Sequence, residues 1–193
     1  MPIVIGSGPS INDYPKEDII DLCRYGFVFC VNSMAFEFPA DIIVALDPQW
    51  IVVNAKLLKR INKPIVTRGY PAVKDLGLDL IYVPMDTLEK YPYSGMVAVK
   101  IADEISRQSE GRPSYILGID GGKGNCKGYK GGGDYSKSRF TDLTKTISLA
   151  MKSKAYLPKL SKLPHPRKIV VTPEYRALTT AWIRHNAAKI LEA

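Results

Sequence analysis

The feature of this sequence that most constrains its fold is a series of short, continuous apolar segments separated by helix-like segments. Two of the apolar segments, Phe27–Val31 and Ile42–Leu46, contain only hydrophobic residues, most of them β-branched or aromatic. A strand with such a continuous apolar run is one that is covered on both faces, as in a parallel sheet between helices. The sequence therefore predicts an α/β fold.

The alternation continues through the first 120 residues of the 193-residue chain. Short apolar runs bounded by turn-forming residues predict four further strands, at residues 3–5, 64–67, 79–83 and 114–119. Amphipathic segments between the strands predict helices at residues 16–24, 49–61 and 94–108. Strands that alternate with helices form a mostly parallel sheet with helices on both faces, so we expect a single Rossmann-like domain over residues 1–193.

The predicted helix at residues 94–108 has the clearest pattern, because apolar residues recur along it every four positions. Ser94 is placed to cap its first turn. Farther along the chain, the sequence predicts a helix that begins at Thr141, a last strand at residues 167–171 and a terminal helix that begins at Pro173.

Composition excludes several classes of protein. Hydrophobic residues make up 46% of the chain and charged residues 24%, as in a globular domain. No uninterrupted apolar stretch is long enough to span a bilayer, and the N-terminus has no secretory pattern. The three cysteines are too few and too scattered for a disulfide framework or a zinc site, so we expect a cytoplasmic protein.

After residue 119 the sequence changes in character. Residues 121–140 contain seven glycines and almost no aliphatic side chains, which predicts a long mobile loop that acts as a lid. Residues 121–170 hold 12 Lys and Arg residues against two acidic ones, whereas the rest of the chain holds 15 basic and 17 acidic residues. Such a basic segment attracts phosphate groups on a nucleotide, a nucleic acid or a membrane surface, although a solvated lysine-rich surface has the same pattern.

Small polar residues follow the predicted strands, where an open parallel sheet binds its ligands. Glycine there lets backbone N–H groups approach a phosphate. Asp47 follows the third strand and Asp120 follows the strand at residues 114–119. The residues after the first two strands, which we predict to bind a nucleotide, are Gly6, Ser7, Gly8, Pro9, Ser10, Asn32 and Ser33.

Simpler interpretations of these residues remain open. The turn "GSGPS" is not the G-x-G-x-x-G dinucleotide motif, because Ile11 stands at the third glycine position, and it is not a Walker A loop. Asn32 is also placed to cap a helix, and Asp47 precedes a proline as turn residues often do.

Four segments together resemble a known superfamily: "VIGSGPSI", "FCVNS", "SGMVAVKIA" and "YILGID". The superfamily includes bacterial sialyltransferases that use a CMP-activated sugar, the motility accessory factors that glycosylate flagellin, and archaeal 6-hydroxymethylpterin pyrophosphokinase-like proteins. The resemblance covers roughly residues 3–120, continues weakly to about residue 152, and fits a phage-encoded member.

The resemblance implies roles for individual residues. It implies that Gly6–Ser10 contact the nucleotide and that Asn32 binds its sugar or base. Ser94 and Gly95 would begin the helix that closes the donor pocket. Sialyltransferases commonly have asparagine where this chain has Asp47, which is more similar to the pyrophosphokinase-like branch, where an aspartate could hold Mg²⁺.

One departure bears on the reaction. Sialyltransferases of this kind place a histidine base just before the helix that follows the lid, but residues 136–140 contain none, and His165 comes too late in the chain. The sequence thus argues against sialyl transfer in particular and leaves the nucleotide site unaffected.

We therefore expect a glycosyltransferase-like enzyme that binds a nucleotide-activated donor, most simply a nucleotide sugar. The catalytic candidates are Asp47, Asp120 and the lid residue Tyr135, and the sequence does not choose among them. The lid cations expected to neutralise the leaving diphosphate are Lys123, Lys127, Lys130, Lys137 and Arg139.

Three alternatives stay open beside it. The first is Mg²⁺-dependent pyrophosphoryl transfer from ATP, with Asp47 or Asp120 as metal ligand. The second is a nucleic-acid-modifying phage protein that contacts backbone phosphates through residues 121–170. The third is a protein that binds a nucleotide without turnover. A homo-oligomer is compatible with each of them.

Overall fold

The computed structural model describes residues 1–85, 91, 93–109, 114–119 and 170–192. The predicted lid at residues 121–140 and the helix predicted to begin at Thr141 lie outside these ranges.

Six strands form one sheet, and every pairing between neighbours is parallel. The sheet order is β5-β4-β3-β2-β1-β6. The strands are β1 (Pro2–Ile5), β2 (Phe27–Val31), β3 (Ile42–Val44), β4 (Ile65–Arg68), β5 (Leu80–Val83) and β6 (Tyr115–Leu117). The predicted α/β, Rossmann-like fold with a parallel sheet is confirmed.

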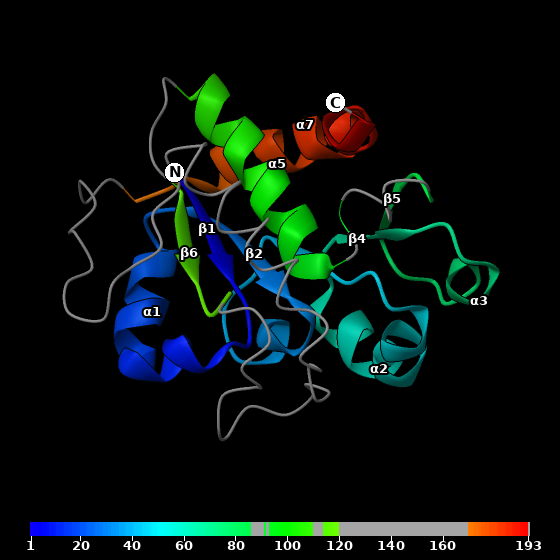
Figure 1. The fold of residues 1–193 in the computed structure, drawn as a ribbon, viewed down its shortest axis with the longest axis horizontal. Helices are drawn as coiled ribbons and strands as arrows, with labels where there is room; N and C mark the ends of the chain where they lie inside the picture. Colours follow the sequence, from blue (N-terminus) through cyan, green and yellow to red (C-terminus); the bar gives the residue numbers. More distant parts are fainter. Residues whose placement is uncertain (86–90, 92, 110–113, 120–169, 193) are drawn as a thin grey trace.

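Helices cover both faces of this sheet (Figure 1). The α-helices are α1 (Lys16–Cys23), α2 (Pro48–Ile61), α3 (Pro71–Lys74), α5 (Ser94–Gln108) and α7 (Pro173–Glu192), and two 3₁₀ helices are η1 (Pro9–Asp13) and η2 (Asn32–Phe36). Helices α5 and α7 pack on one face, and α1, η2, α2 and α3 pack on the other.

Strand β1 shows why its sequence is apolar throughout. Val4 belongs to the core under α5 and α7, whereas Ile3 and Ile5 belong to the core under α1 and α2. Successive side chains of a strand point to opposite faces, so each residue of a strand between two helical layers must be apolar.

Two local expectations are wrong. Ser94 does not cap α5 through its side chain, because Tyr93 is the N-cap residue and the Ser94 hydroxyl accepts the N–H of Leu46 at 3.0 Å. The described end of the strand predicted at residues 167–171, Val170 and Val171, is not in a strand. The Val171 N–H donates instead to the Arg24 carbonyl at the end of α1.

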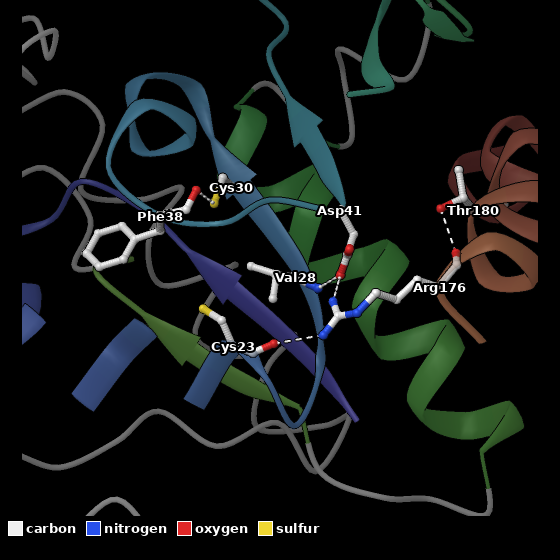
Figure 2. Close-up of polar contacts among 7 residues, drawn as sticks. All are labelled: Cys23, Val28, Cys30, Phe38, Asp41, Arg176 and Thr180. Carbon is white, nitrogen blue, oxygen red and sulfur yellow. Dashed lines mark hydrogen bonds and ion pairs between the residues drawn. The ribbon is translucent and has the colours of Figure 1, made fainter. Parts of the chain in front are cut away.

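Arg176 connects the first turn of α7 to the residues that precede β2 and β3 (Figure 2). Its guanidinium forms an ion pair with the buried carboxylate of Asp41 and donates to the Cys23 carbonyl at 3.0 Å. The same Asp41 oxygen accepts the Val28 N–H at 2.8 Å. One carboxylate therefore joins β2 and β3 to α7.

In the part of the chain that the structure describes, every helix is too short or too polar to cross a membrane.

Candidate functional site

The candidate site lies at the carboxyl ends of β1, β2 and β3. The chain builds the sheet outward from β1 to β5, then returns across one face through α5 and adds β6 on the other side of β1. The strand order therefore reverses at β1, and open α/β sheets bind their ligands at such a reversal.

The turn after β1 packs tightly against the end of β6. The Gly6 and Gly8 N–H groups donate to the carbonyls of Leu117 and Gly118, at 2.8 and 2.7 Å. A Cβ atom on Gly6 would overlap the Ile119 side chain and the Gly118 carbonyl, and one on Gly118 would overlap the Gly6 carbonyl. The two predicted phosphate donors are thus already hydrogen bonded, and glycine is required at position 6 by packing.

The start of α5 meets the same turn. A Cβ atom on Gly95 would lie 3.1 Å from Cδ1 of Ile119, the side chain that also fills the space beside Gly6. Ser94 holds the end of β3 through its hydrogen bond from Leu46. The structure thus brings Gly6, Ser94 and Gly95 together, as three of the predicted site residues.

Asn32 is the most unusual side chain at this edge. It follows β2 directly and has a φ of 50°, in the left-handed region that few residues other than glycine adopt. It starts η2 rather than capping it, since Val31 is the N-cap residue. Its Oδ1 atom is buried and has no hydrogen-bond partner among the described residues, a state that costs free energy unless a ligand or water supplies a donor.

Asp47 lies at the next position along the edge, at the end of β3. It is exposed and is the N-cap residue of α2, with its Oδ1 accepting the N–H groups of Gln49 at 2.9 Å and Trp50 at 3.3 Å. Asp47 therefore has a structural role as a helix cap, in line with its simpler interpretation as a turn residue. Its second oxygen is the one that remains for a ligand or a metal ion.

The remaining predicted site residues divide into two groups. Ser33 is buried within η2, and Ser7 lies in the turn after β1, followed by Pro9 and Ser10 at the start of η1. The predictions for Asp120, Tyr135 and the five lid cations (Lys123, Lys127, Lys130, Lys137 and Arg139) concern residues outside those described.

Sequence reasoning missed an aromatic pair beside this edge. Phe36, at the end of η2, stacks on Trp50, in the first turn of α2, with ring centroids 5.7 Å apart. Phe36 lies on η2, which begins at Asn32, and Trp50 lies on α2, which Asp47 caps. The closeness of both rings in sequence to two predicted site residues is the signal that could have pointed to them. The pair joins η2 to α2.

Tyr14 was also missed. Its hydroxyl is buried and lacks a hydrogen-bond partner among the described residues. Burial, together with the neighbouring Asp13 carboxylate, raises the pKa of Tyr14. The phenol is therefore uncharged at neutral pH and can act only as a neutral donor or acceptor.

Metal-binding side chains do not cluster in the described part of the chain, where no three His, Cys, Asp or Glu residues are placed to hold an ion together. A Mg²⁺ ion at Asp47 would need ligands from a substrate's phosphates or from elsewhere in the chain.

Comparison with known proteins does not assign this site. No family model matches the chain, and no curated protein or solved structure matches it significantly.

Proposed function

We propose that this protein is a transferase that binds a nucleotide-activated donor, most simply a nucleotide sugar, at the carboxyl edge of its sheet. The observation that carries the proposal is the buried amide oxygen of Asn32, which has no hydrogen-bond partner among the described residues. It lies at the edge where open α/β sheets bind their ligands. A ribose hydroxyl or a base N–H of the nucleotide would supply that donor.

The fold also limits how the phosphates bind. Because the N–H groups of Gly6 and Gly8 donate to the carbonyls of Leu117 and Gly118, we assign the phosphates to the first turn of α5. The Met96 and Val97 N–H groups both donate to the Tyr93 carbonyl, whereas those of Ser94 and Gly95, at the helix start, have no backbone acceptor among the described residues. The first N–H groups of a helix favour an anion.

The direct test is calorimetric titration with CMP, UDP, GDP and ATP and the corresponding nucleotide sugars, with and without Mg²⁺. The variant Asn32→Gly keeps the left-handed backbone and removes only the amide, so we expect it to fold and to lose at least about tenfold in affinity. Asn62→Gly is the matched control, because Asn62 has a φ of 51° at the exposed end of α2. Equal affinity in the two variants would overturn the proposal.

Mg²⁺-dependent pyrophosphoryl transfer from ATP is the second candidate, favoured by the exposed carboxylate of Asp47 on this edge. Asp47→Ser separates the two roles of this residue, since serine also caps a helix but binds Mg²⁺ poorly. Mg²⁺-dependent ATP binding that Asp47→Ser abolishes at unchanged stability would favour this candidate over the first. Nucleotide binding that is indifferent to a chelator would exclude it.

A further inference from the structure

Helix α2 presents a cationic, partly apolar face. Residues 48–74 contain six Lys and Arg residues and no Asp or Glu. Val53 and Leu57, one turn apart on α2, are 82% and 45% exposed. The exposed cations of this segment beside them are Lys56, Lys59, Arg60 and Lys63; these six residues form what we call the cationic face.

Helix α1 presents the opposite charge. Asp13, at the end of η1, and Glu17, Asp18 and Asp21 on α1 are all exposed. Ile20 lies among them and is 40% exposed. These five residues form the anionic face. Arg24 at the end of α1 approaches Asp21 at 3.5 Å and offsets the charge only at the edge of this face.

Both faces lie on the same side of the sheet. Helices α1 and α2 pack into the same core, and Figure 1 shows both below the strands, with α1 at the left and α2 at the right. A rotation of one copy by 180° about an axis in the plane of this side, parallel to the strands, would place α1 of each copy on α2 of the other. A perpendicular axis would bring like charges together, so the charge pattern selects one axis.

We propose that a second copy of this chain docks here and forms a two-fold symmetric dimer. The anionic face of each subunit contacts the cationic face of its partner, and Ile20 meets Val53 and Leu57 at the centre of each of the two α1–α2 contacts. Isologous interfaces of this kind are self-complementary and closed. The proposal is independent of the proposed function, because none of these residues is among those proposed to bind the nucleotide.

The charge pattern argues against an anionic membrane as the occupant. A flat lipid surface that reached Lys56 and Arg60 would also approach the acidic residues of α1, which it would repel. A second copy is the partner that satisfies both faces at once. Opposite charges across an interface set its orientation and its salt dependence.

The test is sedimentation velocity of the full chain at low and high salt. At low salt we expect twice the 21.4 kDa mass of one chain, and at high salt a shift toward the monomer, because exposed ion pairs are screened. The variants Lys56→Glu/Arg60→Glu and Glu17→Lys/Asp21→Lys should each dimerise at least about tenfold more weakly, since each places like charges across the interface. Lys100→Glu/Lys189→Glu, on the helices of the other face, is the matched control and should dimerise normally.

Mixing the two charge-reversed variants tests the α1–α2 pairing most directly. Their heterodimer restores both α1–α2 contacts with the signs exchanged, so an equimolar mixture should regain the dimer that neither variant forms alone. Should Glu17→Lys/Asp21→Lys fail to fold, the salt series and the α2 variant still decide. A monomer at low salt, or a dimer that survives both reversals, would overturn the proposal. So would a monomer that binds vesicles of anionic lipid through Lys56 and Arg60, which would assign the cationic face to a membrane.

Discussion

Gly6 and Gly118 pack backbone against backbone, and neither position has room for a side chain. Gly118 also has a φ of 62°, so two independent constraints require glycine there. The contact joins the ends of β1 and β6, the two strands between which the sheet order reverses. It therefore positions the turn after β1 against the residues that follow β6.

Gly118→Ala should therefore lower the free energy of unfolding by more than about 2 kcal/mol, because it adds a steric overlap to the left-handed backbone. Urea denaturation measures the loss. Gly77→Ala is the matched control: its φ is also 62°, but its nearest neighbours would be the end of the Lys59 side chain at 3.8 Å. It should cost only about 1 kcal/mol, the backbone contribution alone. Equal losses would mean that the contact with Gly6 adds nothing.

Ser94→Ala should destabilise the junction between β3 and α5. The Leu46 N–H is buried beneath the start of α5 and would lose its acceptor, at a cost of about 1–3 kcal/mol. Hydrogen exchange should show a faster rate at Leu46. Unchanged protection at Leu46 would contradict this assignment and return Ser94 to the role of an ordinary first-turn residue.

Arg176→Met should destabilise the fold by about 2–4 kcal/mol. The change leaves the Asp41 carboxylate, which is 8% exposed, without its cation, and breaking one side of a buried ion pair is costly. Arg184→Met removes a second ion pair of α7, to Asp79, in which both side chains are 45% exposed. It should cost no more than about 1 kcal/mol. Thermal and urea unfolding measure both losses of stability. A similar loss in the two variants would show that the buried ion pair contributes no more than the exposed one.

Stability should fall at alkaline pH because of two buried thiols. Burial, with a smaller contribution from Asp41, raises the pKa of Cys23 from 9.0 to about 12, and burial raises that of Cys30 well above 9.0. The unfolded chain ionises these thiols first, so their contribution is complete below pH 9 and is lost as pH rises toward 12. Cys23→Ala/Cys30→Ala should flatten the decline in urea midpoint over that range. An unchanged slope would show that other groups cause it.

The sequence predicted the sheet well because a strand buried on both faces appears in the sequence as a continuous apolar run. Phe27–Val31 and Ser94–Gln108 have the predicted bounds. A continuous apolar run indicates a strand buried on both faces, and apolar residues at every fourth position indicate a helix buried on one face. The prediction of a strand at residues 167–171 is wrong for Val170 and Val171. Their apolar character suggested a strand, but it does not show that the Val171 N–H donates to the Arg24 carbonyl.

The candidate site was less predictable. Glycine at position 6 fits a phosphate turn and a tight backbone contact equally well, and the partner that decides, Gly118, lies more than one hundred residues away. The Ser94–Leu46 hydrogen bond and the burial of the Asn32 oxygen likewise depend on tertiary packing. For Asp120, Tyr135 and the lid, the sequence predictions stand as predictions.

The position of α7 in the fold has a consequence for biosynthesis. The six strands that the structure describes end at residue 117, and Ile183, Ala187, Ile190 and Leu191 of α7 join the core on one face of the sheet. A nascent chain that has folded these strands but not yet α7 therefore leaves part of that apolar face uncovered. Exposed apolar surface on an unfinished domain is what chaperones bind, so the ribosome-bound chain should be a chaperone client until α7 emerges and Arg176 reaches Asp41.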